Sequence, residues 1–415
     1  MNNHLIIYNI KTLYTPYLTA PIKGALMNDI KTLDNAFVVI KDEKIYKIGT
    51  NDYKEYITPE TILIDAKNKI MLPGLIDSHT HLVHGGSRED EYTKLLKGVP
   101  YLEILNAGGG IHNTVSKTRA ASFTELYEKA YKSLDEMLKF GVVVVESKSG
   151  YGLNLETEIK QLEVNQKLDE NHDIKIISTY MGAHAFPKNK RATYVDEIIN
   201  DLKVIKAKNI ASSCDVFLED SVFNYDESKK ILTEAKKQGF TVKLHADEIH
   251  SLGGVGLGVE LGATSVDHLM VINDEDIKKL ANSNTLANLL PATSFYLNQN
   301  FAPGRKIIDY GCALSLSTDY NPGSSPTENL QLVMQIAGNK MKLTPEEILT
   351  AVTLNPAYHL KIDDLYGSIE ENKYANLILM DAPNLNYIIY HFGINHTTDV
   401  FIKGRHIVEN KILRR

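Results

Sequence analysis

The chain has 415 residues, of which 43% are hydrophobic and 23% charged, and its formal net charge is −7. These values are typical of a globular protein with one large and one smaller domain. The acidic balance, with a pI near 6.1, gives no electrostatic reason to expect nucleic acid or an anionic membrane as a partner. The start of the chain lacks the features of a signal peptide and no apolar stretch reaches 18 residues, so we expect a cytoplasmic protein. Cys214 and Cys312 lie in apolar runs without CxxC or CxxH spacing and are interpreted as small buried hydrophobic residues.

Both ends of the chain are rich in β-like segments. The first 70 residues contain three of them, at 5–10, 36–48 and 61–66, and the middle one passes through a LysAspGluLys turn at 41–44 that is typical of a hairpin. The last 50 residues contain three more, at 375–381, 399–404 and 405–409. We therefore expect residues 1–70 and 365–415 to form one small β-sandwich beside the main domain.

Residues 71–364 show an alternating pattern instead. Lys/Glu-rich segments of helical period lie at 122–140, 156–171, 194–208, 225–238, 274–283 and 344–353. Between them are eight short apolar runs, at 71–77, 141–147, 175–181, 214–218, 241–245, 265–269, 285–290 and 313–319. Strands that are apolar almost throughout are what a parallel sheet covered by helices requires, and eight in succession predict a (β/α)8 TIM barrel. A doubly wound open sheet is the competing fold, but no GxGxxG follows an early strand.

Histidines gather at the ends of these predicted strands. In a barrel, the active site lies at the carboxyl ends of the strands and in the loops that follow. Five of the 14 histidines fall there, namely His79, His81, His184, His245 and His268. His79 and His81 are two residues apart on one strand and so point to the same face, while Thr80 faces away. A single histidine is more often structural, but five on one rim predict a metal site.

A carboxylate completes a plausible ligand set. Asp319 ends the eighth run, and three imidazoles with one carboxylate leave space for water on a divalent catalytic metal. We assign His79, His81, His245 and Asp319 as the ligands. A metal lowers the pKa of bound water toward neutrality and so supplies hydroxide at pH 7. The AsnProGlySerSerPro segment at 321–326 would place backbone amides and serine hydroxyls near the metal, although a bare turn would look the same.

Two residues near these ligands are candidates for proton transfer and charge stabilisation. Glu248 lies three residues after His245, near enough to shuttle a proton between water and substrate. The alternative is a carboxylate that only favours a helix N-terminus. His268 could polarise the attacked carbonyl or donate to its developing oxyanion, and the alternative is a fourth histidine ligand.

Three further polar residues on the rim are candidates for substrate binding. Arg88 lies in a Gly-rich loop, and a planar guanidinium is suited to holding a carboxylate through two hydrogen bonds. The alternative for Arg88 is a surface salt bridge to Glu89 or Asp90. Tyr151, in a SerGlyTyrGly segment, and His184 could orient a small planar substrate.

This set of residues resembles the amidohydrolase superfamily, in which HxH follows strand one, a histidine follows strands five and six, and an aspartate follows strand eight. HisAlaAspGlu at 245–248 is similar to the single-metal branch, in which the glutamate manages protons. Binuclear members carry a bridging lysine, usually after strand four. Here the fourth run ends without a lysine and Lys148 follows the second run, so we do not predict a carbamylated bridge.

A wider set of motifs, from about residue 36 to the C-terminus, is similar to one group of this superfamily. The matching segments lie at 79–92, 146–152, 180–187, 244–249 and 317–326. The resemblance implies hydrolysis of the ring C–N bond of 4-imidazolone-5-propanoate to N-formimidoyl-L-glutamate in histidine degradation, with one Zn²⁺ or Fe³⁺ per subunit and a homodimer. It also implies substrate or product contacts by Arg88, Tyr151, His184, Glu248, Asn321, Gly323 and Ser324. Departures from the family pattern at Ala292, Asn372 and Asn376 are small, and we expect them to leave the chemistry unchanged.

We therefore expect a metal-dependent hydrolase of a cyclic amide. Its catalytic residues would be His268, which stabilises the oxyanion, and Glu248 with Asp319, which move the proton to the departing ring nitrogen. The alternative enzyme is a single-metal deaminase of an amino-substituted heterocycle, which would release ammonia. A non-catalytic scaffold of the same fold should lack some of the ligands, and this chain keeps all four.

Overall fold

The computed structural model describes residues 4–100, 103, 108–188 and 190–414. Its larger part is built on eight parallel strands that neighbour one another in chain order. They are β6 (Leu75–Thr80), β7 (Val142–Lys148), β8 (Lys175–Ala183), β9 (Ser213–Phe217), β10 (Thr241–Ala246), β11 (Ser265–His268), β12 (Leu286–Leu289) and β13 (Leu314–Leu316). Each matches one of the eight predicted runs, so the expected TIM barrel is confirmed.

The two ends of this sheet meet along a seam between β6 and the segment after β13. The backbone amide of Asp319 donates to the carbonyl of His79 at 3.0 Å, and the amide of His81 donates to the carbonyl of Tyr320 at 2.8 Å. Deeper in the barrel, Ser78 and Ser317 share a hydroxyl hydrogen bond of 2.9 Å. The seam therefore fixes Asp319 beside the two histidines of the first strand.

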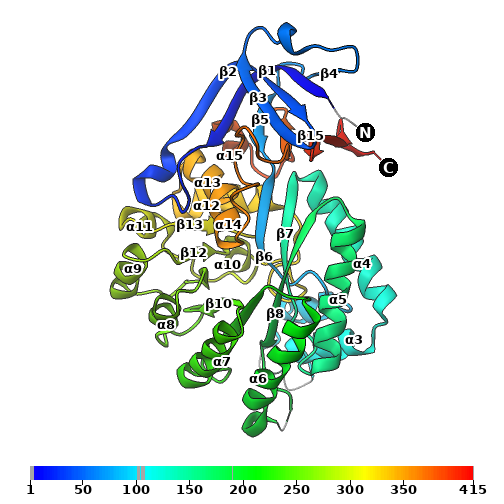
Figure 1. The fold of residues 1–415 in the computed structure, drawn as a ribbon. Coiled ribbons are helices and arrows are strands. Elements are labelled where there is room, and N and C mark those ends of the chain that lie inside the picture. The colour runs from blue at the N-terminus through cyan, green and yellow to red at the C-terminus, as the bar shows by residue number, and fades with distance from the viewer. Residues whose placement is uncertain (1–3, 101–102, 104–107, 189, 415) are drawn as a thin grey trace.

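Helices surround the barrel (Figure 1), and most follow a strand directly. They are α1 (Glu89–Leu96), α3 (Ile111–Ala120), α4 (Phe123–Lys139), α5 (Leu155–Asn171), α6 (Arg191–Lys208), α7 (Tyr225–Lys237), α8 (Gly254–Leu261), α9 (Asp274–Ala281), α10 (Pro291–Tyr296), α11 (Gly304–Asp309), α12 (Leu330–Met341), α13 (Pro345–Ala351), α14 (Leu354–His359) and α15 (Leu385–Tyr390). The six predicted helical segments correspond to α4, α5, α6, α7, α9 and α13. Capping boxes at Ser122, Asn224 and Thr344 start three of these helices.

Helix α8 is absent from the six predicted segments because its sequence, GlyValGlyLeuGlyValGluLeu, is rich in glycine. Packing explains the glycines. A Cβ on Gly254 would lie 2.7 Å from the Cβ of Ala246, and one on Gly258 would lie 2.5 Å from Cγ1 of Val266. The helix therefore packs directly against strands β10 and β11. This close packing stabilises the helix in spite of the low helix propensity of glycine.

The two ends of the chain together form one small β module, at the top of Figure 1, as predicted, and its nine strands belong to a single mixed sheet. Eight of its nine strands run in the order β17-β16-β15-β14-β5-β1-β2-β3, and β4 pairs with β1. The strands are β1 (Leu5–Pro16), β2 (Ile30–Lys41), β3 (Lys44–Thr50), β4 (Ile62–Asp65), β5 (Ile70–Pro73), β14 (Leu377–Met380), β15 (Thr397–Ile402), β16 (Arg405–Glu409) and β17 (Ile412–Leu413). Short 3₁₀ helices η1 (Gly24–Asn28) and η2 (Lys54–Tyr56) interrupt the N-terminal part. Strands from both ends share a core that includes Leu13, Met71, Leu377 and Phe401.

The chain passes from this sheet module to the barrel at Pro73 and Gly74. The apolar run at 71–77 is divided there, because β5 pairs with β14 in the module while β6 opens the barrel. A Cβ on Gly74 would lie 2.4 Å from Cγ2 of Val143, so a glycine is needed where the chain crosses β7. One continuous apolar run thus supplies a strand to each part.

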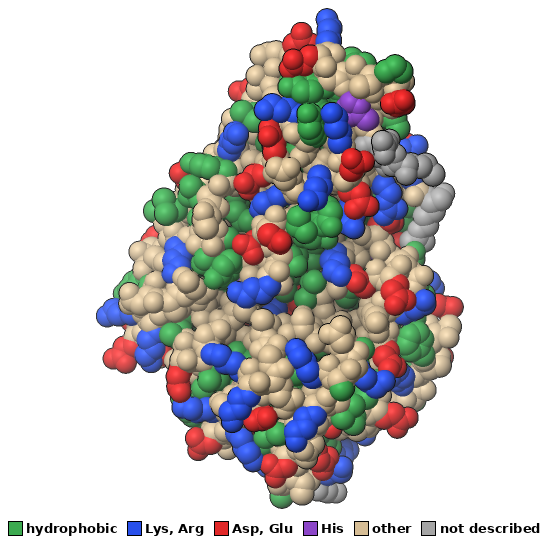
Figure 2. Space-filling model, viewed as in Figure 1, with side chains coloured by type: hydrophobic (Ala, Val, Ile, Leu, Met, Phe, Trp, Pro, Cys, Tyr) green, Lys and Arg blue, Asp and Glu red, His purple; other side chains and the backbone are tan. Residues whose placement is uncertain are grey.

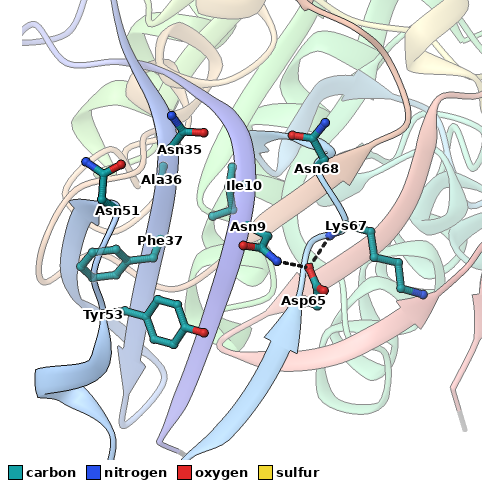
Figure 3. A pocket seen from close by; sticks show the side chains of 10 residues that line it. All are labelled: Asn9, Ile10, Asn35, Ala36, Phe37, Asn51, Tyr53, Asp65, Lys67 and Asn68. Atoms are coloured by element: carbon teal, nitrogen blue, oxygen red, sulfur yellow. Dashed lines mark hydrogen bonds between the residues drawn. The ribbon is translucent and has the colours of Figure 1, made fainter.

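The sheet module also contains a hollow of about 530 Å³ (Figure 3). Asn9, Asn35, Asn51 and Asn68 line it, together with aromatic rings such as Tyr53. All four asparagines are exposed and have positive φ angles between 50° and 66°, a conformation that asparagine tolerates in turns. The four amides are therefore explained by turn geometry, and the hollow lies outside the barrel.

On the face shown in Figure 2, acidic and basic side chains are interspersed rather than gathered by sign. No helix among the described residues is long and apolar enough to cross a membrane. Cys214 and Cys312 are both buried free thiols, as predicted.

Candidate metal centre and active site

Four histidines and one aspartate converge at the carboxyl ends of the barrel strands. His79 lies on β6 with His81 just after it, His245 lies on β10, His268 ends β11, and Asp319 follows β13. Oδ1 of Asp319 is 3.4 Å from Nε2 of His79 and 3.7 Å from Nε2 of His81. The ring centroids of His79 and His245 are 4.5 Å apart. All five side chains are buried, so strands distant in sequence place their donors in one buried space.

The hydrogen bonding of these imidazoles fits a metal ion. Nδ1 of His79 lies 2.5 Å from Oδ2 of Asp267, and Nδ1 of His245 lies 3.1 Å from Oδ1 of Asp215. Their Nε2 atoms are buried and have no hydrogen-bond partner among the described residues. A buried polar atom without a partner is costly, and a carboxylate behind an imidazole is the usual support of a histidine ligand. The residues present therefore fit a cation bound at these Nε2 atoms.

The donor atoms form two overlapping groups in which every atom lies within 4.8 Å of the others. One contains His79, His245 and His268, and the other contains His79, His81 and Asp319. The structure thus brings together all four predicted ligands, and places His268 against the same centre. Both the role of His268 and the choice of four ligands stay predictions.

Burial keeps most of these rings neutral. Desolvation lowers the pKa of His79 and of His81 well below the ordinary value, and it lowers the pKa of His268 to about 3. His245 differs, because Asp215 outweighs burial and raises its pKa. A neutral imidazole can coordinate a metal through one nitrogen and donate a hydrogen bond through the other. The neutral form therefore suits both a metal ligand and a donor to the oxyanion.

Two residues of the site have left-handed backbone conformations that non-glycine residues rarely adopt. The φ angle is 81° at His268 and 54° at Asp319. Oδ2 of Asp319 accepts a hydrogen bond of 2.7 Å from Thr293, which orients Oδ1 toward the histidines. Unusual backbone at buried polar residues is frequent in active sites, where the surrounding structure holds it.

Beneath the histidines is a cluster of five fully buried charged side chains, which we call the charged floor: Glu146, Lys148, Asp215, Lys243 and Asp267. Nζ of Lys148 is 2.9 Å from Oε1 of Glu146, 2.8 Å from Oδ2 of Asp215 and 3.9 Å from Oδ2 of Asp267. Burial alone would lower the pKa of Lys148, but the carboxylates around it outweigh burial and raise it. This ammonium is therefore held as a cation in ion pairs.

Glu248 faces His268 across the site, with 3.8 Å between its Oε2 and Nε2 of the ring. The loop that carries it is held by Glu219, whose Oε2 accepts the backbone amides of Ile249 at 2.9 Å and His250 at 3.2 Å. Burial raises the pKa of Glu248 to about 7, and His245 partly opposes that rise. A carboxyl with a pKa near neutrality can both accept and release a proton at physiological pH.

Arg88 pairs with neither of the two residues considered in the sequence. Its Nε donates at 2.9 Å to Oε2 of Glu91, a buried carboxylate that also accepts the amide of Gly110 at 2.9 Å and the side-chain amide of Asn113 at 2.6 Å. A Cβ on Gly323 would lie 2.1 Å from one terminal nitrogen of Arg88, so a larger residue at 323 would require the guanidinium to move. The alternative of a salt bridge to Glu89 or Asp90 is therefore not what the structure shows, and the guanidinium lies against the 321–326 loop.

Tyr151 and His184 lie beside His81. The rings of His81 and His184 stack at a centroid distance of 4.8 Å, and Tyr151 is 5.6 Å from His81. Nδ1 of His184 is 3.1 Å from the carbonyl of Gly150. Buried Glu158 accepts the amides of Gly150, Gly152 and Leu153, each at 2.8 Å, and so fixes the loop that carries Tyr151. The aromatic wall of the site is therefore preorganised.

The loop at 321–326 is organised by Asn321. Its side-chain oxygen accepts the amides of Gly323 and Ser324 at 2.8 Å each, and its nitrogen donates to the carbonyl of Asp319 at 2.7 Å. Ser324 also accepts from the Asn321 amide at 2.9 Å. Asn321 is thus committed to the turn, while Gly323 lies against Arg88. The predicted contacts of these three residues with substrate stay predictions.

Several residues that shape the site were given no role from the sequence: Glu91, Lys148, Asp215, Glu219, Lys243, Asp267 and Thr293. Three of them carried a signal, because Asp215, Lys243 and Asp267 stand inside apolar strand runs where a charge needs a buried partner. Glu91 and Glu219 gave none. Their partners are backbone amides and side chains that only the folded loops bring near.

Comparison with known proteins agrees with this architecture. A family model described as "Amidohydrolase family" matches residues 70–407. A protein of Fusobacterium nucleatum named imidazolonepropionase is 52% identical over 410 residues, which cover 98% of this chain and 99% of the relative. A protein of the same name from Caldanaerobacter subterraneus is 49% identical over 414 residues, with 98% and 99% covered.

Solved structures with little sequence identity share the fold. The guanine deaminase of E. coli has a TM-score of 0.76 at 14% identity, with 99% of each chain covered. An ochratoxinase of A. niger has a TM-score of 0.72 at 18% identity, covering 99% of this chain and 96% of the other. Since the family model spans most of the chain and the relatives match it almost end to end, the chain belongs to the amidohydrolase family, in the group of the imidazolonepropionases.

Proposed function

We propose that this chain hydrolyses the ring C–N bond of 4-imidazolone-5-propanoate and gives N-formimidoyl-L-glutamate, a step of histidine degradation. The observation that carries the proposal is the convergence of imidazole nitrogens and Asp319 on one buried point, beside a wall that ends in Arg88. Among the described residues, Nε2 of His79 and of His245 have no hydrogen-bond partner there. A cyclic amide with a carboxylate tail fits such a site, because its ring carbonyl can lie at the metal-binding residues while its carboxylate reaches Arg88. The name shared by the relatives at 46–52% identity supports the same substrate.

We infer that His79, His81, His245 and Asp319 hold one metal ion, either Zn²⁺ or Fe³⁺. Three nitrogens and one oxygen suit both metals. One structure of the same fold, an adenosine deaminase from Xanthomonas campestris, is described with bound zinc; it has a TM-score of 0.70 at 17% identity. When bound, such an ion activates a water molecule and polarises the carbonyl group that the water attacks.

The protein's own residues then manage the protons and charge. Glu248 accepts a proton from the attacking water, as its pKa near 7 allows. Neutral His268 donates a ring N–H to the carbonyl oxygen as negative charge develops there. As the C–N bond breaks, Glu248 and Asp319 return the proton to the departing ring nitrogen. Water is thereby added across the bond, with oxygen on carbon and hydrogen on nitrogen.

The substrate is held at its tail and along its ring. The guanidinium of Arg88 binds the propanoate carboxylate, because its Nε is already fixed by Glu91 and its terminal nitrogens remain to donate. Tyr151 and His184 flank the planar ring, and the 321–326 loop closes the carboxylate end through Gly323 and Ser324. We also infer that the enzyme acts as a homodimer, on the family resemblance alone, which sedimentation at assay concentration would test.

The deciding experiment follows the loss of imidazolonepropanoate absorbance, with enzyme that has or has not been treated with a chelator. We expect turnover by untreated enzyme, loss after chelation, and recovery with one equivalent of Zn²⁺ or Fe³⁺. An ammonia assay on the same substrate and on nucleobases separates hydrolysis from the alternative deaminase. Ammonia from a nucleobase, with no loss of imidazolonepropanoate, would overturn the proposal.

A further inference from the structure

The charged floor has one member that contacts the supports of two different histidines. Lys148 is the last residue of β7, and its side chain is completely buried. Its Nζ lies 2.8 Å from Oδ2 of Asp215, on β9, and 3.9 Å from Oδ2 of Asp267, on β11. These two carboxylates come from different strands, and the ammonium is the cation that they share.

Each of these carboxylates orients one candidate ligand through its ring nitrogen. Oδ1 of Asp215 is hydrogen-bonded to Nδ1 of His245 at 3.1 Å. Oδ2 of Asp267 is hydrogen-bonded to Nδ1 of His79 at 2.5 Å. The opposite nitrogens, Nε2 of both rings, are the ones that have no hydrogen-bond partner within the described part of the chain. A rotation of either carboxylate would therefore move an Nε2 atom away from the metal position.

Charge makes this arrangement depend on the lysine. The floor contains three carboxylates and two ammonium groups, all at 0% exposure. Buried carboxylates repel one another strongly unless a cation lies between them, and removal of one partner leaves the others uncompensated. Without Lys148, Asp215 and Asp267 would be free to turn apart, and a carboxylate that has turned does not hold an imidazole in a fixed orientation.

We propose that Lys148 is a positioning residue that sets the affinity and geometry of the metal centre by locking Asp215 and Asp267 behind His245 and His79. This rests on the metal centre proposed above but not on the proposed substrate. Lys148 contacts neither ligand directly and acts through both at once. Loss of a support behind a metal ligand typically weakens binding by about 10–100-fold, and a lysine shared by two supports should lie at the upper end.

The chain offers a matched control in Lys243. It is the other ammonium of the floor and is equally buried, but its ion pair is with Glu146 at 3.2 Å, and no ion pair joins it to Asp215 or Asp267 among the described residues. Lys148→Met and Lys243→Met each remove one positive charge from the same cluster. Both should lower the thermal stability of the metal-free protein, so stability alone does not separate a general charge effect from positioning.

The test measures metal affinity on the full chain without substrate, by competition with a chromophoric chelator for Zn²⁺. The absorption spectrum of the Co²⁺-loaded protein serves as a second readout of ligand geometry. We expect Lys148→Met to weaken Zn²⁺ binding by about 100-fold and to change the cobalt spectrum. We expect Lys243→Met to leave affinity within about threefold of the parent and the spectrum unchanged.

A charge-balanced double variant serves as the control for misfolding. Should Lys148→Met fail to fold, Lys148→Met with Glu146→Gln removes one charge of each sign, and it should show the same loss of affinity. Parent affinity and spectrum in the folded Lys148 variant, single or double, would overturn the proposal, as would an equal loss in Lys243→Met. Absence of metal binding by the parent would instead refute the metal centre itself.

Discussion

The molecule contains the same Lys–Asp–His arrangement twice, once in the barrel and once in the sheet module. In the barrel, Asp215 binds Lys148 through Oδ2 at 2.8 Å and His245 through Oδ1 at 3.1 Å. In the module, Asp399 binds Lys69 through Oδ2 at 2.8 Å and His406 through Oδ1 at 3.0 Å. The distances agree within 0.1 Å, although His245 uses Nδ1 and His406 uses Nε2. Distances alone therefore do not distinguish a metal support from a structural tie.

The second ring nitrogen and the surroundings distinguish them. Nε2 of His245 is buried without a hydrogen-bond partner among the described residues, and His245 forms a group of potential metal ligands with His79 and His268. His406 instead stacks on Phe401 at a centroid distance of 4.3 Å, and its pair retains 8–9% exposure. Both groups of potential metal ligands found among the described residues are in the barrel. Convergence of unsatisfied donors, rather than a buried charged triad, is therefore what marks the functional site.

Replacing the histidine of each Lys–Asp–His triad should give the largest difference between the two triads, in metal content and in kcat. We expect His245→Ala to remove tightly bound metal and to lower kcat by about 10³-fold or more, since a metal contributes several kcal/mol to the transition state. His406→Ala should keep full metal content and near-parent kcat. Metal analysis of the purified variants and the absorbance assay give both readouts. Equal losses of metal in the two variants would remove the distinction.

Substitution of Glu248, the proposed proton-transfer residue, tests whether kcat/KM depends on pH as the raised pKa of this carboxyl requires. With a pKa raised to about 7, the carboxyl of Glu248 is protonated below that pH and ionised above it, and a bound cation would lower the value. As a base, Glu248 must be ionised, so kcat/KM should fall about tenfold per pH unit on the acid side of pH 7 or slightly lower.

Glu248→Gln should lower kcat by about 10²–10⁴-fold and abolish this acid limb. The measurement is a pH–rate profile from pH 5 to 9 for parent and variant. Glu260→Gln, on an exposed helix face, is the control and should leave the profile unchanged. Retention of the acid limb in Glu248→Gln would assign that titration to another group.

Arg88 tests the opposite end of the site, where the substrate tail should bind. Arg88→Ala should lower kcat/KM by about 10–150-fold, the equivalent of about 1.5–3 kcal/mol for a hydrogen bond to a charged group. The loss should be small for an analogue whose carboxylate is replaced by a neutral amide. Arg405→Ala is the control, because it breaks a solvent-accessible pair between the module and Asp173 of the barrel, which follows α5. An equal loss with both substrates would show that Arg88 does not bind the tail.

Much of this arrangement could be predicted from the sequence, for physical reasons. Barrel strands are buried on both sides, so their apolar runs stand out, and the histidines at their ends were found by position alone. Helix α8 was missed because its glycines are explained by packing against Ala246 and Val266, which no local pattern reveals. Glu91 was missed as the partner of Arg88 because its other partners, Gly110 and Asn113, are distant in sequence. The residue types at strand ends could be predicted from the sequence, whereas the contacts that form only when the loops fold could not.

The smallest expected effect concerns the module triad, which should influence stability and nothing else. Lys69 and His406 hold the pKa of Asp399 below its ordinary value, although burial opposes them. A carboxyl with a lowered pKa stabilises the folded protein fully above its unfolded pKa of about 3.9, and that stabilisation is lost as the pH falls through the folded pKa. Asp399→Asn should therefore cost about 1–3 kcal/mol at pH 7, and the difference from the parent should shrink below about pH 4. Denaturant unfolding at a series of pH values measures it.

Glu371→Gln is the matched control for Asp399→Asn. Its pair with Lys47 lies in the same module but is 43–46% exposed, so water already screens the charges and the loss should be below about 1 kcal/mol. Metal affinity and kcat should equal those of the parent in both variants. A fall in metal affinity on Asp399→Asn would mean that the module triad reaches the metal centre. The two triads would then differ in distance from the site and not in kind.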